Sequence, residues 1–178
     1  VAHKNLRIVT TRGAAYGDAV MSALTFPAEF RDLQACYPIV FARNGASYDA
    51  IALLGFEQGE NLFLGPNGWD APTIPLTIER EPFLIGRGGS QVMMHIDLDS
   101  PRVSRTQGEP LFREHGGTTD FLQRMNSVLL AIHEGLQSAP AFVAALTDLG
   151  LLESFVLDVQ REDGSDPGDA WLTVPGFC

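Results

Sequence analysis

CYPIVF at 36–41, AIALLGFEQGENLFL at 50–64 and GWDAPTIPLTIEREPF at 68–83 are the stretches that determine the fold of this chain. Short apolar runs alternate here with glycines and prolines, residues that favour turns and strand ends. This pattern is typical of short strands that fold back on one another. We therefore expect an antiparallel sheet in this region, with the rest of the chain as its cover.

The first hairpin of this sheet is expected around Asn44-Gly45, which lies between the β-rich runs 39–42 and 48–54. The spacing indicates a loop longer than two residues, so the turn type stays open. Residues 61–64 are expected to add a third strand. Three prolines in 70–82 exclude a central strand there and predict an edge or an extended crossing segment.

Three helices are expected to cover the sheet, at 27–36, 120–136 and 140–149, each with apolar residues at helical spacing. Asp120 is the expected N-cap of the second helix. Pro140 is expected to separate the second helix from the third, because proline disrupts a helix interior. The predicted fold class is α+β, a single domain with a mixed, mainly antiparallel sheet and about three helices.

Four further segments complete the expected fold. Residues 82–85 and 91–98 flank a glycine-rich turn and predict a second hairpin. Residues 99–117 are polar and rich in turn residues, which predicts a long irregular loop. The runs 152–159 and 170–174 are expected to be the last strands.

Length and charge bound the classes of function. The 178 residues suit one domain with a core of its own. The net charge is −10, and Lys4 is the only lysine among the twelve basic residues. A nucleic-acid surface needs clustered Lys and Arg, and an anionic membrane attracts basic segments. We therefore expect neither nucleic acid nor a membrane surface as a partner.

The cysteine pattern and the apolar runs predict a cytoplasmic location. Cys36 and Cys178 are far apart and form neither a disulfide framework nor a zinc motif. No apolar run reaches the length of a membrane span, so no transmembrane segment is expected, and no secretory signal is visible. The chain does not begin with Met. We therefore expect the chain to be truncated at one or both ends.

His95 and Asp97 form the one local pattern that suggests metal chemistry. Residues two apart on a strand point to the same face, and a His and a carboxylate there are two ligands of a 2-His-1-carboxylate iron site. His133 or His115 would supply the third ligand. His95, Asp97 and His133 are thus candidate ligands of Fe(II) in an oxygenase that uses a 2-oxo acid. The alternative is a strand with polar residues on its solvent face.

Trp69, Phe63, Phe56 and Tyr37 are candidate walls of a pocket for a small ligand or a protein partner. Aromatic residues at strand spacing also belong commonly to the core. Hydrolase motifs are incomplete, because Ser90 is followed by Gln91-Val92 where a nucleophile elbow requires glycine. The sequence contains no complete catalytic motif.

The order HKNLRI, FPAEF, YPIVF, ALLGF, GENLFL, GW and EPF, followed by FVAALTDLGLLE, resembles the SapC family of bacterial proteins. The resemblance implies an accessory or interaction protein without a cofactor, associated with the production of surface-layer or outer-membrane proteins. It therefore implies a protein partner, and it carries no established set of catalytic residues. The chain departs from the family in having Glu79-Arg80-Glu81 before Pro82-Phe83, where family members have Arg-Arg-Tyr.

Overall fold

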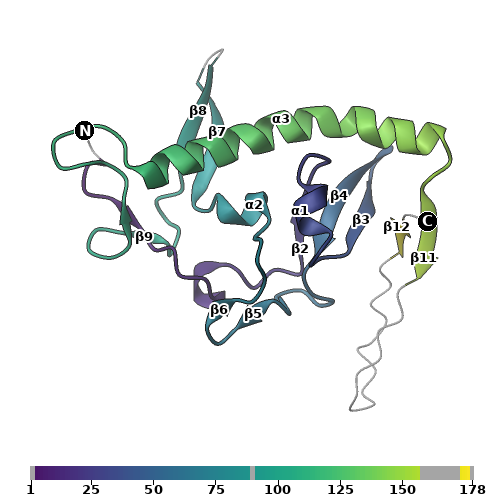
Figure 1. Ribbon diagram of the computed structural model, residues 1–178, viewed down its shortest axis with the longest axis horizontal. Coiled ribbons are helices and arrows are strands. Elements are labelled where there is room, and N and C mark those ends of the chain that lie inside the picture. The colour runs from purple at the N-terminus through teal and green to yellow at the C-terminus, as the bar shows by residue number, and fades with distance from the viewer. Residues whose placement is uncertain (1–2, 89–90, 157–172, 177–178) are drawn as a thin grey trace.

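The computed structural model describes residues 3–88, 91–156 and 173–176. One long helix runs across the whole molecule, with small antiparallel sheets and two short helices packed mainly along one side of it (Figure 1). The α+β fold class predicted from the sequence is confirmed. The strands do not form one sheet, however. In the described part of the chain they form five small sheets.

The elements follow one another with short connections. In chain order they are β1 (Arg7–Ile8), η1 (Ala14–Tyr16), β2 (Ser22–Leu24), α1 (Phe30–Leu33), β3 (Ile39–Asn44), β4 (Ser47–Leu53), β5 (Leu64–Gly65), β6 (Gly68–Trp69), α2 (Leu76–Glu79), β7 (Phe83–Gly88), β8 (Gln91–Ile96), β9 (Val103–Ser104), β10 (Glu109–Pro110), α3 (Asp120–Asp148), β11 (Glu153–Val156) and β12 (Thr173–Gly176).

The hairpin of β3 and β4 is confirmed, but its loop is shorter than expected. Asn44 pairs with Ser47, so only Gly45 and Ala46 lie between the strands. Gly45 has a φ of 60°, which glycine adopts without steric cost. A glycine of positive φ at the first loop position is the pattern of the type II′ turn, whose twist matches that of the flanking strands.

The third strand of this sheet is β2, not residues 61–64 as expected. The strand order is β2-β4-β3, and Ala23 of β2 pairs with Ala52 of β4. Both edges of β4 are therefore occupied before the chain reaches position 61. The following residues form the separate ribbon of β5 and β6 instead.

Residues 99–117 are not the irregular loop that their composition predicted. β9 and β10 lie within this segment and pair with the two sides of β1, in the order β10-β1-β9. The polar turn residues of the segment form the connection between two very short strands. A partner strand about a hundred positions earlier in the chain gives the segment its order, and local composition does not report such a partner.

The second hairpin is confirmed by the pairing of β7 with β8, while its turn at 89–90 lies outside the described residues. The expected strand 152–159 is present as β11, and 157–159 lie outside the described residues. The last strand, expected at 170–174, is β12 at 173–176, and 170–172 also lie outside. β12 lies beside β3 (Figure 1).

Helix α3 joins the two helices expected on either side of Pro140. Proline removes one backbone hydrogen bond, but the same apolar face continues past it, with Ile132 and Val143 buried on either side. Burial of that face holds the two halves in one helix. The N-cap is Thr119, not Asp120 as expected, because the Thr119 hydroxyl accepts a hydrogen bond from the Leu122 amide.

Helix α1 is a single turn flanked by turns, shorter than the expected 27–36. The expected apolar face nevertheless forms, with Phe26, Leu33 and Tyr37 all buried. Short helices depend on tertiary packing for their stability. The apolar spacing was therefore a better guide to burial than to helix length.

The core consists of three main clusters beneath α3 and on the inner face of the β2-β4-β3 sheet. The first is Leu6, Ile8, Phe26, Phe83, Leu111, Met125, Val128, Leu129 and Ile132. The second is Ala23, Leu33, Tyr37, Ala52, Leu54 and Ile78, and the third is Phe41, Ala50, Val143 and Leu146.

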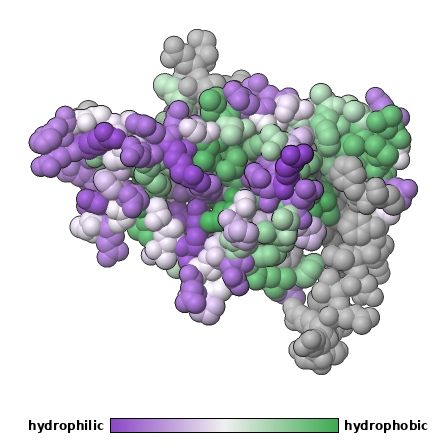
Figure 2. Space-filling view, viewed as in Figure 1, coloured by the Kyte–Doolittle hydropathy of each residue, from purple (hydrophilic) through white to green (hydrophobic). Residues whose placement is uncertain are grey.

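The surface of α3 differs between its two ends. Hydrophobic side chains gather over its C-terminal half and hydrophilic ones at the β1–β9 end of the molecule (Figure 2). Leu149, at the C-terminal end, is 71% exposed. By length and apolar composition alone α3 is also long enough to cross a membrane, a property shared by the core helices of many water-soluble proteins.

Glu29 links α1 to α2 through a buried carboxylate. It accepts a hydrogen bond from the Thr25 hydroxyl at 2.7 Å and another from the Leu76 amide at 2.6 Å. The Leu76 amide is the first of α2 and has no partner within that helix. Burial raises the pKa of Glu29 above its usual value of 4.5. The folded chain therefore holds the Glu29 proton more tightly than the unfolded chain does.

Wild type is expected to lose stability as the pH rises through the pKa of Glu29, and Glu29→Gln is expected to abolish this loss. A raised folded pKa gives a stabilising contribution that is complete below pH 4.5 and is lost as the pH rises through the folded pKa. Gln keeps both hydrogen bonds, since its amide can accept from Leu76 and donate to Thr25. Urea unfolding of both chains from about pH 4 to pH 8 measures the difference. Parallel curves would contradict the assignment.

Candidate functional site

Three of the aromatic residues singled out in the sequence lie together in the second core cluster. The rings of Tyr37 and Phe63 meet edge to face, with centroids 4.6 Å apart. The Trp69 Nε1–H donates to the Tyr37 hydroxyl at 2.8 Å. That hydroxyl in turn donates to the carbonyl of Thr73. The chain of hydrogen bonds fixes β6 and the segment after it against the turn that follows α1.

Tyr37 and Trp69 therefore act mainly as packing residues. Tyr37 is 2% exposed, and burial raises the pKa of its hydroxyl. A buried hydroxyl needs a hydrogen-bond partner, and Trp69 and Thr73 satisfy it. Neither ring lines the pocket described next. Phe63, the third aromatic residue of the cluster, does line that pocket.

An apolar pocket of about 270 Å³ opens beside this cluster. Phe56 and Phe63 line it, as the sequence suggested for both. The remaining walls come from the hairpin of β3 and β4 and from the segment that follows it, namely Pro38, Val40, Leu53, Leu54, Gly55 and Leu62. This set of eight residues is called the apolar pocket below.

A carboxylate fixes the loop that carries Phe56. Glu60 Oε2 accepts hydrogen bonds from the amides of Phe56 at 2.7 Å and Glu57 at 3.3 Å. Gly55 allows the close turn, because a Cβ there would lie 2.7 Å from the Glu60 carbonyl oxygen. The wall at Phe56 is therefore held in place before anything binds.

The apolar pocket suits a ring or a branched aliphatic side chain. An apolar cavity of about 150 Å³ is known to stay dry and bind benzene, and this pocket is larger. Leu62 is 60% exposed at its edge. An exposed apolar patch that contains a hollow is a common site of protein contact or ligand binding.

The strongest electrostatic feature is a buried ion pair between Asp18 and Arg102. Arg102 Nη2 donates to both carboxylate oxygens of Asp18, at 2.6 and 2.7 Å. The Gly13 amide donates to Asp18 Oδ2 at 2.7 Å, and the Arg102 guanidinium lies over the ring of Tyr16. Both charged side chains are almost completely buried.

Arg12 extends this ion pair to α2. Its Nη1 lies 3.2 Å from Asp18 Oδ1 and 3.3 Å from the Ile78 carbonyl oxygen. Burial, and then the nearby charge of Arg102, lower the pKa of Arg12. The ion pair thus joins the N-terminal segment, the β9 segment and α2. Sequence reasoning missed it, because 84 positions separate Asp18 from Arg102.

Of the three candidate iron ligands, His95 lies on β8, Asp97 directly follows that strand and His133 lies on α3. His95 is exposed on β8, with its ring against Gly86 of β7. Asp97 Oδ1 accepts from the Asp99 amide at 3.0 Å, and His133 on α3 contacts Gln137 at 2.8 Å. Among the residues that the structure describes, no three His, Cys, Asp or Glu side chains form a group able to hold a metal. The geometry gives the iron prediction no support.

Comparison with known proteins identifies a family. A family model described as SapC matches residues 1–174. No curated protein and no solved structure matches the chain.

Proposed function

Because the chain belongs to the SapC family, we propose that it is a non-catalytic accessory protein that binds a protein partner in the cytoplasm. The resemblance noted in the sequence associates this role with the production of surface-layer or outer-membrane proteins. The apolar pocket is the proposed contact for an apolar side chain of the partner. The exposed Leu62 at its edge is the observation that carries the proposal.

The shape of the pocket supports binding of a protein side chain. Phe56 and Phe63 form walls fixed by the Glu60 hydrogen bonds and by the ring of Tyr37. A rigid apolar pocket that receives one large side chain is the common centre of a protein interface. The partner residues around that side chain would then cover the exposed part of Leu62.

Replacement of Leu62 by Asp is expected to reduce capture of the partner at least tenfold. A carboxylate at the edge of the pocket would lose its hydration when the partner docks, without a gain that offsets it. The measurement is affinity capture from native lysate by the tagged chain, quantified as partner recovered per chain. The wild-type chain should recover one partner in stoichiometric amount.

Leu98→Asp is the matched control, because Leu98 is 53% exposed and lies outside the apolar pocket. It introduces the same charge and should leave recovery of the partner unchanged. Equal recovery by Leu62→Asp and wild type would show that the partner binds elsewhere. Repeated empty captures by the wild-type chain would rule out the accessory role.

The volume of the pocket also favours a second candidate function, the binding of a small apolar ligand. The pocket of about 270 Å³ would accommodate an aromatic ring without a protein attached to it. A ligand that binds only the folded chain raises its melting temperature. Indole should then raise the melting temperature of both wild type and Leu98→Asp. That result, together with empty captures, would favour this candidate over the accessory role.

A further inference from the structure

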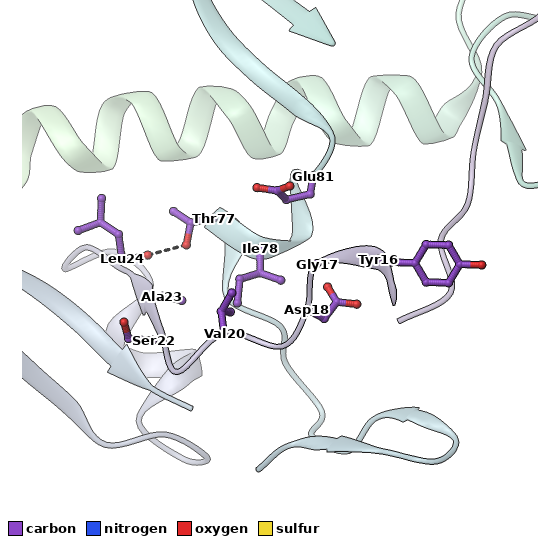
Figure 3. A pocket seen from close by; sticks show the side chains of 10 residues that line it. All are labelled: Tyr16, Gly17, Asp18, Val20, Ser22, Ala23, Leu24, Thr77, Ile78 and Glu81. Carbon is purple, nitrogen blue, oxygen red and sulfur yellow. Dashed lines mark hydrogen bonds between the residues drawn. The ribbon is translucent and has the colours of Figure 1, made fainter. Parts of the chain in front are cut away.

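A second cleft, of about 210 Å³, lies between the free edge of β2 and helix α2. Figure 3 shows Ser22, Ala23 and Leu24 along one side of it and Thr77 and Ile78 of α2 along the other. The cleft is distinct from the apolar pocket, with which it shares no lining residue. Its wall at β2 offers backbone groups in addition to side chains.

The pairing of β2 with β4 determines which backbone groups point into the cleft. The Thr25 amide donates to the Ala50 carbonyl, and the Leu54 amide donates to the Met21 carbonyl. Residues 21, 23 and 25 therefore exchange hydrogen bonds with β4. In an antiparallel ladder the residues between them turn their amides and carbonyls to the opposite side. Those residues are Ser22 and Leu24.

One contact confirms this orientation. The Leu24 carbonyl accepts a hydrogen bond from the Thr77 hydroxyl of α2 at 2.7 Å, across the cleft (Figure 3). β2 is an edge strand of its sheet. The Ser22 amide, the Ser22 carbonyl and the Leu24 amide thus face the cleft, and none of them makes a backbone hydrogen bond within the described part of the chain.

We propose that the free edge of β2 binds a short extended peptide by strand addition in the cleft between β2 and α2. The added strand runs antiparallel to β2. The peptide residue opposite Ser22 exchanges two main-chain hydrogen bonds with it, and the carbonyl of the peptide residue opposite Leu24 accepts from the Leu24 amide. The Leu24 carbonyl stays with Thr77, so the added strand ends opposite Leu24 and is about three residues long. Main-chain bonds of this kind give affinity with little dependence on sequence.

The side chains that line the cleft set the preference for the peptide. Val20 and Ile78 are apolar and lie close to each other beside Ala23 (Figure 3). They favour a small apolar or β-branched residue opposite Ala23, because directly opposed residues of neighbouring strands share one face of the sheet. The Asp18 carboxylate lines the cleft but already binds Arg102 and Arg12. It is therefore a structural wall of the cleft.

The experiment selects peptides from a display library of random nine-residue sequences against the full chain and measures their dissociation constants. Selected peptides are expected to bind wild type and Ser22→Ala equally and to bind Ser22→Pro at least tenfold more weakly. Proline has no amide hydrogen, so it removes the donor at position 22 that faces the cleft. It removes no hydrogen bond to β4, so β2 should still form. A circular-dichroism melt checks that the proline variant is folded.

Hydrogen exchange in the wild-type chain gives a second measurement, which does not depend on the variant. Bound peptide should slow exchange of the Ser22 and Leu24 amides and leave the Ala23 amide, already paired with β4, unchanged. The proposal is overturned if selected peptides bind Ser22→Pro as tightly as wild type or leave those two amides unprotected. It also fails if the library yields no binder.

Leu62→Asp separates this proposal from the accessory role. Peptides at the β2 edge should bind this variant as they bind wild type. Peptides that lose affinity for it occupy the apolar pocket, a result that would overturn strand addition at β2 and leave the proposed function standing.

Discussion

Replacement of Asp18 by Ala is expected to lower the free energy of unfolding by about 3–5 kcal/mol, the usual cost of breaking a buried ion pair. Arg102 is 1% exposed, and Asp18 is the one carboxylate that contacts its guanidinium among the described ion pairs. Without that carboxylate, Arg102 and the nearby Arg12 keep buried positive charges that face each other. Small domains are stable by only about 5–15 kcal/mol, so the loss is large.

Urea unfolding of Asp18→Ala and of a control, Arg113→Ala, measures this effect. The Arg113–Asp120 pair has a similar distance, 2.7 Å, but its side chains are 59% and 91% exposed. Its loss should cost only about 0–1 kcal/mol, because water screens exposed pairs. The double variant Asp18→Ala with Arg102→Met should lose less than the two single variants combined, because no unpaired guanidinium remains at 102. Equal effects of Asp18→Ala and Arg113→Ala would refute the argument.

Gly108→Ala is expected to destabilise the chain by about 2–5 kcal/mol, from two separate causes. Gly108 has a φ of 94°, which costs a residue with a Cβ about 1–2 kcal/mol. A Cβ at this position would also lie 2.1 Å from the carbonyl oxygen of Ile8 in β1. Overpacking of this kind typically costs about 1–3 kcal/mol. The atom that blocks the Cβ belongs to a strand backbone between two partners, so it cannot move aside cheaply.

Gly116→Ala separates the two causes. Gly116 has a similar φ of 98°, but a Cβ there would meet nothing within 4 Å. Its substitution should therefore cost only the backbone part, about 1–2 kcal/mol. The difference between the two variants in thermal or urea unfolding measures the contact with Ile8. Equal costs would mean that β1 yields to the added methyl group.

Local sequence signals predicted several elements correctly. The glycine after Asn44 between two β-rich runs gave the hairpin of β3 and β4, and the apolar spacing of Phe26, Leu33 and Tyr37 gave a buried face. These features depend on residues that are close in the chain. Turn geometry and side-chain periodicity act over a few positions, so they can be recognised without a known partner.

The candidate sites could be predicted only in part. Phe56 and Phe63 were candidates for a pocket wall because aromatic side chains commonly line pockets, and the core was the alternative for them. The shape of the apolar pocket depends on Val40 and Leu53, which strand pairing brings side by side from two parts of a hairpin. The cleft at β2 had no sequence signal at all. It exists because β4 pairs with β2 on one side and leaves Ser22 and Leu24 facing α2 on the other.

The sequence by itself determined the α+β class, the antiparallel hairpins, the apolar faces of the helices and the resemblance to the SapC family. Tertiary structure alone decided that α3 continues through Pro140, that β1 lies between β9 and β10, and that Asp18 meets Arg102. Propensity and periodicity are properties of neighbouring residues, whereas burial and ion pairing depend on segments that meet only after the chain has folded.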